Sequence, residues 1–193
     1  MGKDRLAAFS DGVIAIIIIT IMVLELHVPQ GSDASALAAI APSFLTYVLS
    51  FIYVGIYWNN HHHLLHTVMR VDGLILWANL HLLFWLSIIP VATAWMGQNL
   101  SAPLPTAIYG AALFMPAIAY MLLQWAIVHR HGKQSVLAEA LGRDLKGKMS
   151  PTLYGAGIVL AFVNPWLSIA LYVLVAIMWL VPDRRIERIV GRE

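Results

Sequence analysis

Polar side chains that can exchange protons or hold ions stand at the start of an almost unbroken apolar run of this 193-residue chain. The run RLAAFSDGVIAIIIITIMVLEL carries Arg5, Ser10 and Asp11, and four consecutive isoleucines follow. Charged groups in an apolar segment are costly unless they are paired, and they commonly mark ion or proton paths. Asp11 with His61, further along the chain, is one pair that can relay a proton.

The rotation of this first segment can be followed from the sequence, because successive residues of a helix turn by about 100°. On one stripe lie Arg5, Phe9, Gly12, Ile16, Thr20, Val23 and His27, with Ile19 at its edge. Ser10 and Asp11 point well away from that stripe, and Glu25 lies on the opposite face. A plainer interpretation is an ordinary lipid-anchored helix, whose first turn is capped by Ser10 and Asp11.

The composition indicates an all-α integral membrane protein. Of all residues 60% are hydrophobic and only 11% are charged, with a mean hydropathy of +0.77, whereas soluble domains carry roughly 25% charged residues. The chain has no cysteine, which excludes a disulfide framework, a zinc thiolate site and a catalytic thiol. The elements that must position the polar residues are therefore membrane-spanning helices.

We expect a single domain over residues 1–193 with six spanning helices, because about 20 mostly apolar residues cross a bilayer. The expected spans are 7–28, 40–62, 71–96, 105–129, 150–163 and 166–182. An Asn164-Pro165 turn would separate the last two, since proline ends a helix. The one long polar stretch, residues 129–150, is either a short amphipathic helix at the interface or a solvated connector.

All 12 lysine and arginine residues fall on one side of this six-span arrangement. The positive-inside rule then predicts a multi-pass protein of the cell membrane with both termini in the cytoplasm. A competing interpretation of residues 3–36 is a cleaved signal peptide, with Ala34-Ser35-Ala36 as the cleavage site. Asp11 argues against it, because a signal peptide has no use for a carboxylate before its apolar run.

Histidines cluster in the run His61-His62-His63-x-x-His66, but we expect no metal site there. Adjacent histidines on one helix diverge by about 100° and cannot converge on one ion. Only His62 and His66 have the i, i+4 spacing, and no cysteine assists them.

The motif Arg5-x-x-x-Phe9-Ser10-Asp11, followed by Gly12 and an apolar helix, resembles the signature of the transmembrane-protein-175 family of bacterial and lysosomal potassium channels. Trp58-x-x-His61 is similar to the family's second-helix motif. Asp72, Asn79 and Pro90 fall where its third helix has similar residues. The motifs are concentrated in residues 5–90.

The resemblance implies a bacterial homotetramer with six helices per subunit, in which four copies of the first helix line a central pore. The family lacks the usual potassium-selectivity loop, and TVGYG is absent here too. Its ring of large aliphatic side chains falls on Ile16, with Ile19 or Thr20 and then Val23 on the next turns. The family often has threonine three positions after the constriction, whereas here that position is Ile19 and Thr20 follows.

We expect the interior polar residues to pair with one another, since unpaired polar groups are costly inside a membrane. Arg5, Asp11, His61 and Asn79 would form a network near the cytoplasmic end, to which Trp58 donates its indole N–H. With Phe9 and Ser10, this network would fix the rotation of the first helix. The isoleucines would then project as a ring that stops ions by dewetting.

The function that the sequence favours is passive potassium conduction through this pore. The expected partners are potassium ions, the lipid bilayer and further copies of the chain, with no cofactor and no nucleic acid. A proton-coupled secondary transporter that uses Asp11 and His61 is the main alternative. An enzyme is a weaker one, because the sequence shows no nucleophile elbow, metal motif or phosphate loop.

Overall fold

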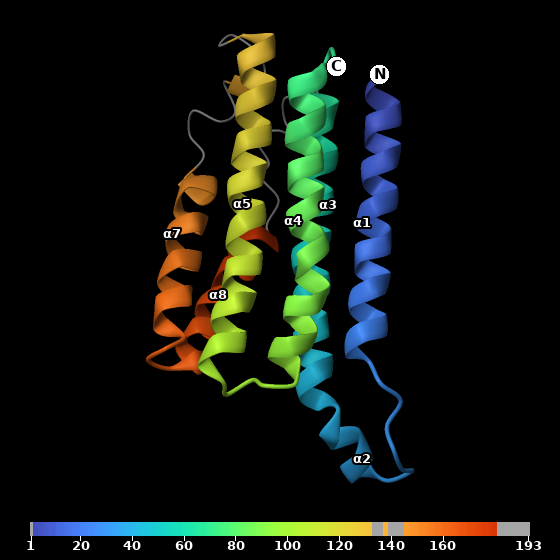
Figure 1. Ribbon diagram of the computed structural model, residues 1–193, viewed down its shortest axis with the longest axis vertical. Helices are drawn as coiled ribbons and strands as arrows, with labels where there is room; N and C mark the ends of the chain where they lie inside the picture. The colour runs from blue at the N-terminus through green and yellow to red at the C-terminus, as the bar shows by residue number, and fades with distance from the viewer. Residues whose placement is uncertain (1, 133–136, 139–144, 181–193) are drawn as a thin grey trace.

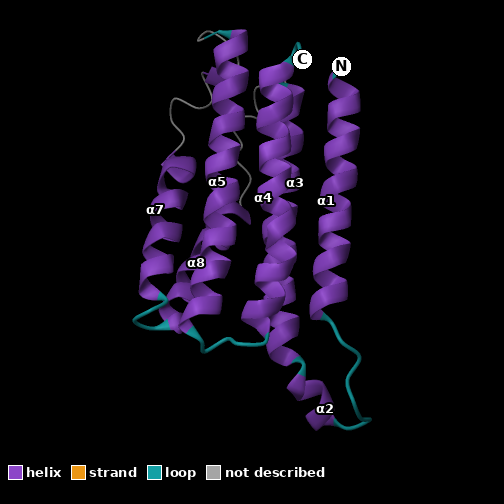
Figure 2. Cartoon of the chain, in the orientation of Figure 1, coloured by secondary structure: helices purple, strands orange, loops and turns teal. Residues whose placement is uncertain are grey.

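The computed structural model describes residues 2–132, 137–138 and 145–180, and every regular element in these ranges is a helix (Figures 1 and 2). The helices pack side by side along one common direction, apart from a short helix at one end. In chain order they are α1 (Lys3–Glu25), α2 (Ala34–Ala39), α3 (Ala41–His66), α4 (Gly73–Gly97), α5 (Pro103–His131), α7 (Leu145–Leu160) and α8 (Pro165–Leu180).

Four of these helices, α1, α3, α4 and α5, are long and apolar enough to cross a membrane. Their ends lie within a few residues of the predicted spans 7–28, 40–62, 71–96 and 105–129. Helix α8 is apolar but has 16 residues, and α7 has the same length. The all-helical class is therefore confirmed, while the crossing of the membrane by α7 and α8 stays a prediction.

Two local features differ from the expected pattern. The short helix α2 has no counterpart among the expected spans. Asp33 caps it, and the Asp33 side chain accepts a hydrogen bond from the Ala36 N–H at 3.0 Å. This bond, with a second one from Ser35, lowers the pKa of Asp33 below its ordinary value. Residues 133–136 and 139–144 of the polar stretch 129–150 lie outside the described residues, while α5 extends into the stretch as far as His131 and α7 begins within it at Leu145.

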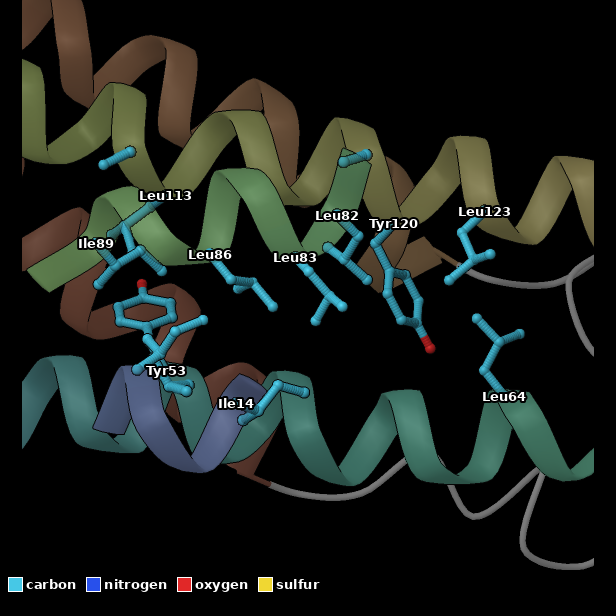
Figure 3. Close-up of a cluster of buried hydrophobic side chains, with 14 of the residues drawn as sticks. Ile14, Tyr53, Leu64, Leu82, Leu83, Leu86, Ile89, Leu113, Tyr120 and Leu123 are labelled. Carbon is cyan, nitrogen blue, oxygen red and sulfur yellow. The ribbon is translucent and has the colours of Figure 1, made fainter. Parts of the chain in front are cut away.

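The core lies between α4 and the helices on either side of it (Figure 3). Ile14 from α1 and Tyr53 from α3 point toward Leu86 and Ile89 of α4, and Leu113 joins them from α5. Helix α1 packs on α3 and α4 and supplies several of the fully buried side chains. A cleaved signal peptide would make no such contribution to the core.

Polar contacts join the α3–α4 connection to the end of α5. Asp72 caps α4 by accepting the Ile75 N–H at 3.0 Å, and its other carboxylate oxygen pairs with Arg130. The Nε2 atom of His131 accepts hydrogen bonds from the N–H groups of Met69 and Arg70 at 3.1 and 3.2 Å. These contacts place Arg70 and Arg130 at the end of the bundle where α1 begins (Figure 1).

Close packing at two glycines joins α5, α7 and α8. The buried Tyr172 ring of α8 lies against Gly110 of α5 and Gly157 of α7, where any Cβ atom would overlap it. Its hydroxyl donates to the Thr106 carbonyl at 3.3 Å. The tyrosine therefore fills a space that only glycine leaves open.

We expect Gly110→Ala to destabilise the protein, because the added methyl group has no room beside Tyr172. Overpacking of this kind costs about 1–3 kcal/mol. The measurement is the thermal unfolding midpoint of the purified protein in detergent. Gly155→Ala is the matched control: it lies in the same group of helices with nothing within 4 Å of its would-be Cβ, so it should stabilise by up to about 1 kcal/mol. Equal midpoints for the two variants would contradict the packing described here.

Candidate functional site

Helix α1 has two sharply different faces. Buried against α3 and α4 are Leu6, Ser10, Ile14, Ile17, Ile21 and Glu25. Exposed on the subunit surface are Phe9, Ile16, Ile19 and Val23, while Thr20 is half-buried. Ile16 and Ile17 are neighbours of identical type, yet one lies on the surface and the other in the core. The stripe predicted from helical geometry is thus the face that the subunit leaves uncovered.

A hydrogen-bonded triad joins α1, α4 and α3. Asn79 of α4 donates from Nδ2 to the Ser10 hydroxyl at 2.9 Å and accepts at Oδ1 from His61 Nε2 at 2.7 Å. Ser10 in turn donates its hydroxyl proton to the Leu6 carbonyl at 2.9 Å. The exposed fractions of Ser10, Asn79 and His61 are 0%, 0% and 1%. Buried polar groups in such surroundings are stabilised only when they are paired, as these are.

The bonds of the triad determine the tautomer of His61. Since Asn79 uses its NH₂ group on Ser10, its carbonyl oxygen faces His61 and needs a proton from Nε2. The Nδ1 atom of a neutral ring is then a buried acceptor, and it has no hydrogen-bond partner among the described residues. A buried acceptor without a partner is costly, so Nδ1 is the atom of the triad where a water molecule would be most stabilising.

A second contact, between Asp11 and Trp58, lies beside the triad. The Trp58 indole N–H donates to Asp11 Oδ1 at 3.0 Å and joins α3 to α1 on a partly exposed side. Asp11 also interacts electrostatically with His61. Two directional side-chain hydrogen bonds therefore hold α1, one from Asn79 of α4 and one from Trp58 of α3, and the bond between His61 and Asn79 ties those two helices together.

Arg5 and Phe9 are not brought into this network. Arg5 is exposed at the end of the bundle, and its side chain makes no hydrogen bond or ion pair within the described residues. The Phe9 ring is exposed on the same face as Ile16. The physical reason is their position on the helix, because both lie on the stripe that points away from α3 and α4.

Glu25 is a buried group whose environment the sequence did not indicate. It ends α1 on the core side, and its carboxylate lies against Gly97 at the end of α4. Neither carboxylate oxygen accepts a hydrogen bond within the described part of the chain. A carboxylate buried in apolar surroundings is costly unless it is paired.

Further buried hydroxyls occupy the middle of the subunit, away from α1. The Ser50 hydroxyl bonds to those of Thr93 and Tyr109, at 2.8 and 2.9 Å. A cavity of about 50 Å³ lies between α3, α5, α7 and α8, lined in part by Tyr57, Tyr154 and Gln124. In the sequence, the buried hydroxyls and the cavity are indicated only by hydroxyl and amide side chains within apolar runs. The sequence does not indicate which of these side chains contact one another.

The Thr20 hydroxyl donates to the Ile16 carbonyl at 2.8 Å, within its own helix. Its proton is therefore engaged, while the lone pairs of the oxygen stay available to a cation. The site as a whole combines an apolar exposed stripe with a set of polar contacts on the side of α1 that faces the other helices. We call these contacts the polar anchor: the Ser10–Asn79–His61 triad and the Asp11–Trp58 hydrogen bond. Such an arrangement can present a hydrophobic surface in one fixed rotation, and it contains no nucleophile activated by a base.

Comparison with known proteins gives consistent matches. Residues 5–90 match the family model described as endosomal/lysosomal potassium channel TMEM175. A protein named potassium channel from Chryseobacterium sp. (strain P1-3) is 56% identical over 97% of both chains. Another so named, from Streptomyces collinus, is 31% identical over 92% of this chain and 91% of its own. The crystal structure of a lysosomal potassium-selective channel TMEM175 homologue from Chamaesiphon minutus aligns with a TM-score of 0.81, at 29% identity, over 94% of this chain and 97% of that one.

Asn79→Ala is expected to destabilise the subunit, because it leaves both His61 Nε2 and the Ser10 oxygen without their partner. Each orphaned buried group costs about 1–3 kcal/mol. Thermal unfolding in detergent measures the loss. Ser87→Ala on the same helix is the control, since that exposed hydroxyl donates to the Phe84 carbonyl of its own helix and to no other helix within the described residues. If Asn79→Ala unfolds at the same temperature as Ser87→Ala, the triad does not anchor α1.

Proposed function

This chain belongs to the family of the endosomal/lysosomal potassium channel TMEM175, and we propose that it is a potassium channel that conducts passively through a membrane. The observation that carries this conclusion is the 56% identity over 97% of the chain with a protein named potassium channel. The family resemblance seen in the sequence is confirmed by these matches. It is a family of channels rather than enzymes, and the four long apolar helices fit a multi-pass membrane protein.

The pore, in this proposal, runs along the axis of a homotetramer and is lined by four copies of α1. Helix α1 lies at one edge of the subunit (Figure 1), with α3 and α4 on its inner side. The exposed fractions of Ile16, Ile19 and Val23 are 64%, 55% and 63%, respectively. An apolar face of this size on an edge helix is available for contact with further copies of the chain.

Ile16 forms the narrow ring of the proposed pore. Four isoleucine side chains that meet at an axis supply no oxygen to replace the water around a cation, so the ring resists wetting and restricts ions. Val23, seven residues on, shares the same face and is exposed almost as much as Ile16. The Thr20 oxygen is the nearest side-chain oxygen along the helix, and its free lone pairs can face a cation beside the Ile16 ring.

The orientation we propose puts both termini in the cytoplasm of a bacterial cell, across its inner membrane. Lys3, Arg5, Arg70 and Arg130 lie at the same end of the bundle, and positively charged residues are retained on the cytoplasmic side. The polar anchor of α1 is then nearer the cytoplasmic face than Glu25 is. The relatives from the bacteria Chryseobacterium sp. (strain P1-3) and Streptomyces collinus support this location.

Reconstituted into liposomes, the protein should pass potassium at a rate that rises linearly with the potassium gradient and is independent of a proton gradient. The measurement is potassium flux against gradient, with and without a pH difference of either sign. Empty liposomes prepared in parallel give the leak. Saturation at low millimolar potassium, together with a requirement for the proton gradient, would instead establish the transporter that uses Asp11 and His61.

Ile16→Asn should raise the potassium flux and weaken discrimination against sodium, because an amide wets the ring. A barrier lowered by about 1.4 kcal/mol would raise the flux roughly tenfold. Met22→Asn is the matched control: Met22 is exposed on the same helix but lies about 120° around it from Ile16. Flux is normalised to the protein incorporated. An equal increase in the Met22 variant would show that Ile16 does not face the pore.

A further inference from the structure

Two of the clustered histidines at the end of α3 face each other. His62 and His66 are one turn apart, both side chains are exposed, and their Nε2 atoms lie 3.1 Å apart. Their ring centroids are separated by 4.5 Å. His61 is excluded from this pair, because it is buried and bonded to Asn79. We propose that His62 and His66 form a binding site for a divalent transition-metal ion such as Ni²⁺, Cu²⁺ or Zn²⁺.

The distance between the two nitrogens suits a shared metal ion. Metal–imidazole bonds are about 2.0–2.1 Å long, so two nitrogens 3.1 Å apart subtend an angle of about 98° at the ion. This angle lies between the roughly 90° of square-planar Cu²⁺ or Ni²⁺ and the roughly 109° of tetrahedral Zn²⁺. An ion placed between the rings therefore needs no change in the helix backbone and only small rotations of the side chains.

The protonation state that the site needs is accessible. Without metal, one Nε2 carries a proton that it donates to the other. With metal, both rings carry their proton on Nδ1 and both Nε2 lone pairs point at the ion. Both rings stay neutral, so the exchange moves one proton from Nε2 to Nδ1 of the same ring and releases none. Metal and shared proton compete for the same space, which makes the hydrogen bond seen here the metal-free form of the site.

Adjacent histidines on one helix cannot converge on one ion, but His62 and His66 are one turn apart, and two ligands suffice for an open site. Within the described residues, no group of three or more metal-ligating side chains assembles. The remaining positions on the ion are then left to water, which reaches both exposed rings. An open site with two protein ligands selects nitrogen-seeking transition metals over Mg²⁺ and Ca²⁺, which prefer oxygen.

The site lies on the same side of α3 as the anchor of α1. Trp58, one turn before His62, donates to Asp11, and its ring lies 6.2 Å from that of His62. Lys3 and Asp4 of α1 interact electrostatically with His66. A bound ion that cross-links His62 and His66 would thus stiffen the turn of α3 that faces the start of α1. The inference does not rest on the proposed function, since binding can be measured without any flux.

The test uses the full chain, purified in detergent without a polyhistidine tag. We expect isothermal titration with NiCl₂ to show one ion per subunit. His62→Ala and His66→Ala should each weaken binding by about tenfold or more, because even loss of a group that only supports a ligand costs about 10–100-fold. His63→Ala is the matched control and should bind nearly as the unaltered chain does. Its ring packs edge-on against that of His62, with 5.7 Å between centroids, but the facing nitrogens are those of His62 and His66.

Electron paramagnetic resonance of bound Cu²⁺ gives a second readout, in which hyperfine structure from two imidazole nitrogens is expected. Thermal unfolding with and without Ni²⁺ shows whether the variants fold, and Ni²⁺ should raise the midpoint only where both His62 and His66 are present. Absence of binding at millimolar Ni²⁺ would overturn the proposal. So would equal weakening by His63→Ala, or a Cu²⁺ spectrum with a single nitrogen.

Discussion

Apolar packing alone lets a helix rotate or slide with little penalty in a membrane, where lipid is as apolar as the neighbouring helices. The side-chain amide of Asn79 removes that freedom, because it donates to Ser10 of α1 and accepts from His61 of α3 at the same time. Turning α1 by one residue would break a bond in a place that water does not readily reach. The contact of Asp11 with Trp58 adds a second constraint at a different angle. The rest of the α1 surface follows from this fixed rotation.

Fixing α1 in this way separates the residues that hold the subunit together from those that face outward. Ile17 is buried and contributes to the core, whereas Ile16 is 64% exposed and contributes little to the folding of one subunit. A change at Ile16 can therefore alter what the exposed face does at small cost in subunit stability. A change at Ile17 acts first on the fold. The functional interpretation of the isoleucine run depends on this difference between adjacent residues.

Much of this could be predicted from the sequence, because membrane helices need long apolar runs and turn at a constant angle. The four long helices and the opposite placement of Ser10 and Ile16 on α1 both follow from those two facts. Helix α2 did not, since six residues after a capping aspartate leave no periodic signal. The exposed position of Arg5 and the packing of Glu25 against Gly97 could not be predicted either, because contacts between helices depend on how each helix is rotated about its axis. The packing of the Tyr172 ring against Gly110 and Gly157 cannot be predicted from the sequence for the same reason.

The order of the chain gives the polar anchor a consequence during synthesis. Trp58 and Asn79 follow their α1 partners by 47 and 69 residues. At about 5–20 residues per second, the ribosome needs roughly 3–14 s to deliver Asn79 after Ser10. During this interval α1 is at the membrane while Ser10 and Asp11 lack their hydrogen-bond partners on α3 and α4. Ser10 and Asp11 lie in the N-terminal half of α1, nearer to the interfacial water than the isoleucines that follow, so α1 can be inserted early and take up its final rotation only after α4 has been made.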